Sequence, residues 1–212
     1  MCIRDRSNGG LSHLADPNFD DFRDQNQSFQ SIAKYTAEPL SVSGTSQPTR
    51  TVVAAVTPQF LTVFGVEPII GRDFTASDDQ KGAGPVALVS SGYWREYLGS
   101  PQDLSQAHLK IDNAIYSVIG VLPSEFRFPN DVDVWIAADR DGESLSRTSH
   151  NYSGVGRLKA GVSVDQARAD ISAIARRIYL ASNEKTDYLL RDGTVVPLQE
   201  SITCLLYTSR CV

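Results

Sequence analysis

The sequence predicts an α+β fold, and three observations support that prediction. The first and last thirds of the chain each follow a strand, helix, strand pattern. The central third is rich in hairpin signals, with strand-like runs at residues 109–112 and 115–121. The clearest amphipathic helix lies in the last third, where Ile171, Ile174 and Ile178 recur at steps of three and four. We therefore expect helices packed on sheets, with a hairpin-rich insertion between the two outer thirds.

The central third begins with a short apolar strand at residues 86–89, which leads directly into an aromatic helix. Ser90 or Ser91 can cap this helix, and Gly99 can close its C-terminus. One helix face carries Tyr93, Trp94, Tyr97 and Leu98. The pattern predicts a strand that feeds a short aromatic helix.

A hairpin follows that helix. Residues 109–112 and 115–121 are joined at Asn113, a residue type that tolerates the left-handed backbone of a tight turn. An aromatic loop over residues 123–129 then leads to residues 132–136, whose alternation predicts a further half-buried strand.

In the first third, Asp16 and Pro17 predict a helix start, with Asp16 as the capping acceptor and Pro17 in the first turn. Residues 28–35 predict a second short helix or an extension of the first. Two strands at residues 40–44 and 50–56 are expected to pair.

Thr57 and Pro58 then repeat the helix-start signal, and Gly65 ends that helix. In the last third, residues 152–158 have strand character. Ser163 and Gln166 form a capping box at the start of the amphipathic helix. Residues 194–198 predict a final strand, with Pro197 at an edge or a strand end.

Two polar stretches, residues 73–85 and 137–151, have the composition of surface loops or hinges. We place subdomain boundaries there.

The two chain ends have an unusual sequence. Codons that can encode residues 1–5 are largely the reverse complement of codons that can encode residues 204–209. An inverted repeat of this kind predicts translated sequencing adapter, so we expect residues 1–6 and 204–212 to contribute nothing to the core. All three cysteines, Cys2, Cys204 and Cys211, fall in these ends, so cysteine counting gives no information.

The formal charge of −5 becomes about −7 without the charged residues of the ends, so nucleic acid is not an expected partner. No apolar run approaches the length of a membrane span.

Catalytic and cofactor motifs are incomplete. Residues 156–163 resemble a phosphate-binding loop, but Val162 stands where that loop requires Lys. Gly154 and Gly156 give a weak dinucleotide-like pattern without its acidic partner. The three histidines, His13, His108 and His150, lack ligands at metal-site spacing. We therefore expect no enzyme activity, no cofactor, no metal and no catalytic residue.

One group of side chains is a candidate binding site. Aromatic residues of the central third could line an apolar ligand groove or could form the core of that subdomain. These residues are Tyr93, Trp94, Tyr97, Phe126, Phe128 and Trp135.

Taken together, the order of these motifs resembles the periplasmic core domain of MacB/FtsX-like ABC transporter permeases, of the duplicated acidobacterial type. The resemblance rests on the Tyr-Trp helix, the Ile-Asp-Asn hairpin and Asp-Val-Trp-Ile of the central third. It extends upstream through residues 19–29, 56–68 and 71–74, and downstream through residues 156–163.

The resemblance implies a core domain over residues 7–203. In it, a porter-like β-α-β subdomain is formed from residues 11–72 and 152–203, and an inserted mainly-β subdomain spans residues 85–136. It further implies transmembrane spans outside the fragment and a non-catalytic role in coupling their motion to export on the outer side.

The expected partners are a separate ATP-binding subunit, a second permease copy and a periplasmic adaptor, at the bacterial inner membrane. A free periplasmic binding or interaction module is the alternative that the residues leave open.

Overall fold

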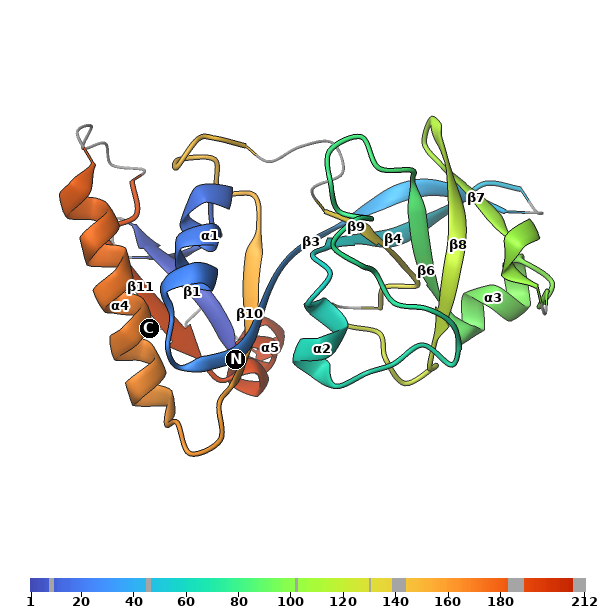
Figure 1. The fold of residues 1–212 in the computed structure, drawn as a ribbon. Helices are drawn as coiled ribbons and strands as arrows, with labels where there is room; N and C mark the ends of the chain where they lie inside the picture. The colour runs from blue at the N-terminus through green and yellow to red at the C-terminus, as the bar shows by residue number, and fades with distance from the viewer. Residues whose placement is uncertain are drawn as a thin grey trace. The chain divides into compact units, whose positions relative to one another are not determined.

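A computed structural model describes residues 1–7, 10–44, 47–101, 103–129, 131–138, 144–182 and 189–207. The chain divides into two compact units (Figure 1). Unit 1 contains Met1–Lys34 and Glu143–Val212, and unit 2 contains Tyr35–Gly142. The predicted α+β class is confirmed, because one unit is formed from both chain ends and the other is a mainly-β insertion.

Unit 1 is built on a four-stranded path in the order β11-β1-β10-β3. Its strands are β1 (Cys2–Ser7), β3 (Phe29–Ser43), β10 (Ser153–Leu158) and β11 (Asp192–Val196), and the short β2 (Gly10–Ser12) pairs with β1. Strand β1 is antiparallel to both β10 and β11. With one helix after β1 and another after β10, this is the β-α-β-β-α-β arrangement of ferredoxin-like folds.

Two helices, α1 (Asp16–Gln25) and α4 (Val164–Ala181), cover one face of this sheet (Figure 1). Phe19 and Phe22 of α1 meet Ile171 and Ile174 of α4 in one hydrophobic cluster, which also contains Val195 of β11. A third helix, α5 (Leu198–Tyr207), follows β11. None of the described helices is long and apolar enough to cross a membrane.

Unit 2 is a ring of six strands that closes on itself. Starting from β3, each strand pairs with the next in the order β4 (Thr49–Val56), β9 (Val134–Ala137), β6 (Val86–Ser90), β8 (Ala114–Leu122) and β7 (His108–Ile111). Strand β7 then pairs with the end of β3 through Val42↔Ile111. Closure leaves the ring without a free edge. The short β5 (Ile70–Gly71) pairs with β8 at Gly120 and Val121, beyond the residues of β8 that pair with β7.

Three short helices complete unit 2: α2 (Phe60–Phe64), α3 (Ser91–Tyr97) and the 3-10 turn η1 (Leu104–Gln106). Ser90 caps α3 as predicted, since its Oγ accepts the Tyr93 backbone N–H at 3.0 Å. Gly65 ends α2 with a φ of 68°, a left-handed conformation that favours glycine.

The helix that the sequence predicts most clearly is confirmed. Ser163 Oγ accepts the Gln166 backbone N–H at 3.2 Å, and Gln166 Oε1 accepts the Ser163 backbone N–H at 2.8 Å. This capping box fixes the first turn of α4 in the predicted register.

The subdomain boundaries differ in part from the prediction. The predicted second boundary, residues 137–151, contains the division after Gly142. The first division lies between Lys34 and Tyr35 instead of within residues 73–85, so residues 35–72 belong to unit 2 and not to the porter-like part. The sequence hid this division because it falls inside the continuous strand β3.

Three local predictions are wrong. Residues 28–35 are not helical but lead into and begin β3. Their apolar pattern is too short to distinguish the helical period of 3.6 residues from the strand period of two, and pairing with neighbouring strands supplies the backbone hydrogen bonds. Asp16 is not a capping residue: Ala15 occupies the N-cap position. In the hairpin, Asp112 and not Asn113 takes the left-handed backbone, with a φ of 49°.

Within the first six residues, Cys2 and Ile3 are part of the core, contrary to the prediction. Strand β1 pairs with β10 and β11 on its two sides. Ile3 is 0% exposed and belongs to the helix–sheet cluster of unit 1. The sequence pattern of residues 1–6 could not reveal that β1 is buried, because its burial results from pairing with β10 and β11, which are distant in the sequence. At the other end, residues 208–212 lie outside the described residues, and residues 204–207 form the end of α5.

Gly154 and Gly156 serve the packing of β10. A Cβ atom at Gly154 would lie 2.8 Å from Leu14 Cδ1, and one at Gly156 would lie 2.5 Å from Phe29 Cδ1. Both distances are shorter than van der Waals contact, so only glycine admits these neighbours. Close packing therefore accounts for the dinucleotide-like pair of glycines.

Replacing Ile3 tests the role of β1. We expect Ile3→Ala to lower the free energy of unfolding by about 2–5 kcal/mol, because it leaves a cavity in the core. Leu180→Ala is the matched control: Leu180 is 74% exposed, so its loss should change stability by no more than about 0.5 kcal/mol. Urea denaturation of both variants measures the difference. Equal stability of the two variants would contradict a core position for Ile3.

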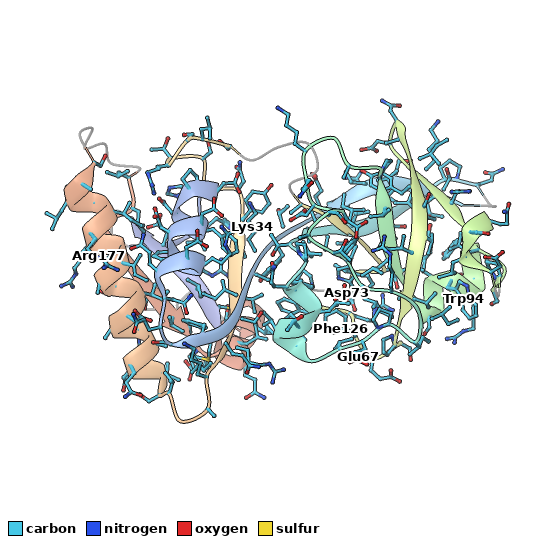
Figure 2. The ribbon with its side chains drawn as sticks, viewed as in Figure 1. Lys34, Glu67, Asp73, Trp94, Phe126 and Arg177 are labelled. Atoms are coloured by element: carbon cyan, nitrogen blue, oxygen red, sulfur yellow. The ribbon has the colours of Figure 1, made fainter. Side chains whose placement is uncertain are left out.

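The loop after β5 holds two aspartates with opposite behaviour. The Arg72 guanidinium contacts both Asp78 oxygens, at 2.7 and 2.9 Å, and this hydrogen bonding lowers the pKa of Asp78 to about 2. Burial raises the pKa of Asp73 (Figure 2) to about 6 from its usual 3.8, against a backbone hydrogen bond from Phe74. Ionised Asp73 is therefore a source of instability near neutral pH.

Asp73→Asn should stabilise the protein in a pH-dependent way. The folded protein holds the Asp73 proton more tightly than the unfolded chain, so wild-type stability falls as pH rises through the interval between 3.8 and about 6. The variant has no such proton to lose, and its Oδ1 can still accept the Phe74 N–H. The variant should thus exceed the wild type in free energy of unfolding by more above pH 6 than near pH 4. Denaturation at both pH values measures it, and an advantage independent of pH would contradict the raised pKa.

Candidate functional site

A buried ion pair lies where the chain leaves unit 1. Lys34 of β3 (Figure 2) is 0% exposed. Its Nζ lies 2.6 Å from Oδ1 of Asp16, which is 2% exposed. Asp16 is the first residue of α1, where the positive end of the helix dipole stabilises a carboxylate. Lys34 Nζ also lies 5.5 Å from the Phe19 ring centroid and 4.8 Å from that of Tyr152. The ammonium is thus held by one carboxylate and two aromatic rings.

The same carboxylate holds the segment where the chain returns to unit 1. The Ser144 backbone N–H donates to Asp16 Oδ2 at 2.8 Å. Asp16 therefore binds Lys34, the last residue before the insertion, and Ser144, close after it. We call these three residues the Asp16 anchor.

Arg147 strengthens the attachment of the returning segment to α1. Its NH1 group donates to Asn18 Oδ1 and lies against Asp21 Oδ2, both at 2.8 Å. Asn18 is fully buried, and its Nδ2 donates to the Arg147 carbonyl at 3.4 Å. The first two turns of α1 thus fix the returning segment at several points.

Sequence reasoning missed the Asp16 anchor. Lys34 stands beside apolar residues in a strand, and this position indicates that its side chain is buried. A buried lysine requires a partner that compensates its charge. That signal indicates a partner but does not name it, because Asp16 and Ser144 meet Lys34 only in the folded unit.

The six aromatic residues of the predicted groove fall into two groups within unit 2. On α3, the Tyr93 and Tyr97 rings stack with centroids 4.7 Å apart, and Trp94 packs against the same core cluster. Phe126, Phe128 and Trp135 instead join a group with Tyr35, Phe60 and Phe64.

Burial separates the core members of these groups from the exposed ones. Trp135 is 0% exposed, and its Nε1 donates to the Phe128 carbonyl at 3.0 Å. Tyr93 and Phe126 are also buried, and burial raises the pKa of Tyr93 to about 12. Only Trp94, Tyr97 and Phe128 keep partial exposure, and Phe128 belongs to a different group from Trp94 and Tyr97. The structure therefore does not bring the six residues together as one groove.

Two of the histidines lie near each other in unit 1. His13 Nδ1 is 3.1 Å from Ser153 Oγ, and His150 Nε2 is 3.5 Å from Asp5 Oδ2. Burial, followed by the charge of Arg4, lowers the pKa of His13. The serine and the carboxylate contact different histidines, so the arrangement differs from a Ser-His-Asp relay. Among the described residues, no three His, Cys, Asp or Glu side chains are placed to hold a metal ion.

Solved structures share this fold. A domain of a putative permease from Porphyromonas gingivalis has a TM-score of 0.62 at 16% identity, covering 83% of this chain and 82% of that one. The periplasmic region of MacB from Actinobacillus actinomycetemcomitans has a TM-score of 0.66 at 11% identity, covering 99% and 93%. The extracellular domain of the ABC-type transporter YknZ from Gram-positive bacteria has a TM-score of 0.65 at 12% identity, covering 93% and 99%. These similarities define a fold found in the extracytoplasmic domains of permeases.

The sequence identifies the family within that class. Residues 3–174 match the MacB-like periplasmic core domain, and the chain belongs to this family of ABC transporter permease domains. Such a domain is the periplasmic or extracellular part of a membrane transporter permease. The comparison with curated proteins gives no match.

Substitutions at Lys34 test the buried pair. Lys34→Met should lower the free energy of unfolding by about 3–5 kcal/mol, because it leaves the Asp16 carboxylate buried without its cation. The double variant Asp16→Asn with Lys34→Met should recover most of that loss, since no buried charge is left. Lys159→Met, at an exposed lysine, is the control and should be nearly neutral. Urea denaturation compares the variants, and a double variant as unstable as Lys34→Met would contradict the pairing.

Proposed function

We propose that this domain couples the motion of the transmembrane helices of an ABC transporter permease to substrate export on the outer side of the membrane. In this role it performs no catalysis and requires no cofactor. Membership of the family supports a location in a transporter permease. The observation that supports the coupling role is the Asp16 anchor.

The topology explains why an anchor in unit 1 matters. Both ends of the chain belong to unit 1, so any segment that precedes or follows it in a longer protein attaches there. A displacement applied to unit 1 can reach unit 2 through the two chain connections, at Lys34 and near Gly142. A device that holds both connections makes them move together.

The chemistry of the anchor suits this task. The contacts of Asp16 to Lys34 and to Ser144 are short, at 2.6 and 2.8 Å; the first is buried in an interior of low dielectric constant, and the second is partly buried. Removing either partner would leave a buried charge uncompensated or a partly buried N–H unsatisfied, so the anchor resists opening under load. We infer that unit 1 moves as one body and pulls both connections at once.

The family supports a partner ATP-binding subunit, which would supply the energy for this motion. We further propose a second permease copy and a periplasmic adaptor as partners, with the domain on the periplasmic side of a bacterial inner membrane.

Distance measurements between the units test the proposal. We would place spin labels at Ala173 of α4 and Glu96 of α3, both exposed, in a full-length permease whose native cysteines are replaced. With the partner ATPase present, we expect the inter-label distance to change between the nucleotide-free and ATP-bound states, as measured by double electron–electron resonance.

Two double variants separate the anchor from general stability. Asp16→Asn with Lys34→Met keeps an oxygen that can accept the Ser144 N–H, whereas Asp16→Leu with Lys34→Met removes it. We expect the nucleotide-dependent distance change to be reduced in the first variant, which loses the contact to Lys34, and to broaden or disappear in the second, which loses both contacts. A distance that never responds to nucleotide in the wild type would reject the coupling role. An equal response in both variants would reject the part assigned to Asp16.

A further inference from the structure

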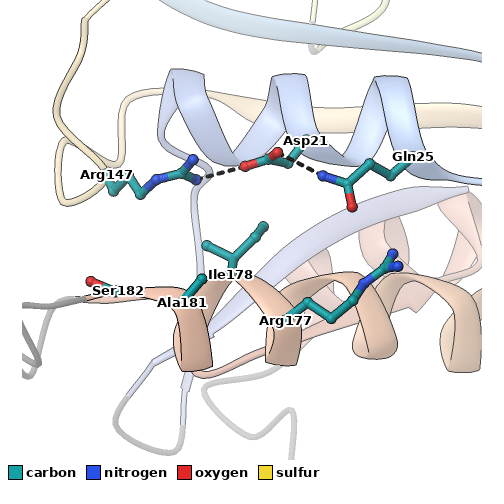
Figure 3. A pocket seen from close by; sticks show the side chains of 7 residues that line it. All are labelled: Asp21, Gln25, Arg147, Arg177, Ile178, Ala181 and Ser182. Carbon is teal, nitrogen blue, oxygen red and sulfur yellow. Dashed lines mark hydrogen bonds and ion pairs between the residues drawn. The ribbon is translucent and has the colours of Figure 1, made fainter.

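An open pocket of about 310 Å³ lies between α1 and the C-terminal part of α4 in unit 1 (Figure 3). This volume is at the lower end of the range for small-molecule sites. Ser182 lies at its end, and its principal lining residues are Asp21, Gln25, Arg147, Arg177, Ile178 and Ala181.

The acidic residue of the pocket is already engaged by its neighbours. Gln25 Nε2 donates to Asp21 Oδ1 at 2.7 Å, and Arg147 NH1 lies 2.8 Å from Asp21 Oδ2 (Figure 3). One carboxylate oxygen thus accepts a hydrogen bond from Gln25, and the other forms an ion pair with Arg147. Asp21 and Arg147 balance each other in charge.

Arg177 differs from the other arginines of α1 and α4. Arg23 pairs with Asp20 and Asp24, Arg168 with Asp165, and Arg176 with Asp192. Arg177 is exposed and, within the described part of the chain, has no hydrogen bond or ion pair. Its guanidinium lies at the pocket across from Asp21 and Gln25 (Figure 3).

The pocket therefore has one surplus positive charge and an excess of hydrogen-bond donors. A guanidinium presents two parallel N–H groups, which match the two oxygens of a carboxylate. Ile178, which is buried, and Ala181 add an apolar wall beside it. This combination fits a ligand with a single negative charge and a short hydrocarbon part.

We propose that this pocket binds a small organic monocarboxylate through Arg177, with the apolar part of the ligand against Ile178 and Ala181. The pocket shares Asp21 and Arg147 with the contacts of the returning segment, but the ligand contact proposed at Arg177 does not rest on the coupling role. A phosphate dianion fits less well, because it would bring two negative charges close to Asp21 and would leave the apolar wall without contact.

Titration of the ¹⁵N-labelled 212-residue chain with sodium isovalerate tests the site. At constant ionic strength, we expect saturable chemical-shift changes at Gln25 and in the last turns of α4. Arg177→Gln should weaken binding about tenfold or more, because it removes the charge-assisted hydrogen bonds. Arg176→Gln removes the same charge from the adjacent position outside the pocket, and should leave the affinity within about twofold.

Inorganic phosphate serves as the second probe and should bind at least tenfold more weakly than isovalerate. Tighter binding of phosphate would overturn the assignment to a carboxylate. Loss of affinity that is equal in Arg177→Gln and Arg176→Gln would indicate a general charge effect and overturn the role of Arg177. An absence of saturable chemical-shift changes in the wild type would overturn the site. Unchanged melting temperatures of both variants would exclude misfolding as the cause of any loss of affinity.

Discussion

The burial of Lys34 is the constraint on which the organisation of unit 1 depends. A desolvated ammonium requires a compensating charge, and Asp16 supplies it from the first turn of α1. The ion pair links α1 to β3, which follows it in the sequence. The second oxygen of Asp16 accepts the backbone N–H of Ser144 and so binds the returning segment. Since a buried ion pair adds little net stability compared with apolar packing, we interpret its role as specifying one arrangement of these three segments.

Strand β3 explains how one chain forms two units with few connections. Residues 29–34 complete the ferredoxin-like sheet, and residues 35–43 begin the closed ring. A strand that continues from one unit into the next is a stiffer connection than a flexible loop, because its residues are hydrogen-bonded on both parts of its length. The Asp16 anchor lies beside the point at which β3 passes from one unit to the other. A domain of this family that transmits motion would benefit from stiffness at that point.

The two units use their aromatic and charged residues differently. In unit 2, aromatic side chains mainly fill the interior, and Trp135 is fully buried with its N–H satisfied. In unit 1, charged residues take part in specific contacts between α1, β3 and the returning segment. Arg177 stands outside these contacts and faces the pocket, whereas Asp21 and Arg147 both line the pocket and attach the returning segment to α1.

The sequence by itself determined the elements whose signals are local. The capping box of Ser163 and Gln166, the Ser90 cap and the paired strands before residue 57 depend on residues close together in the chain, and the structure has them as predicted. The motif order was also sufficient to identify the family. Tertiary structure decided the features that depend on distant partners. Strand pairing on both sides made residues 2–7 part of the sheet, and neighbouring strands turned residues 29–35 from a possible helix into β3. The anchor could not be predicted because Asp16, Lys34 and Ser144 are brought together by folding, and charge compensation in a buried interior selects partners by position in space.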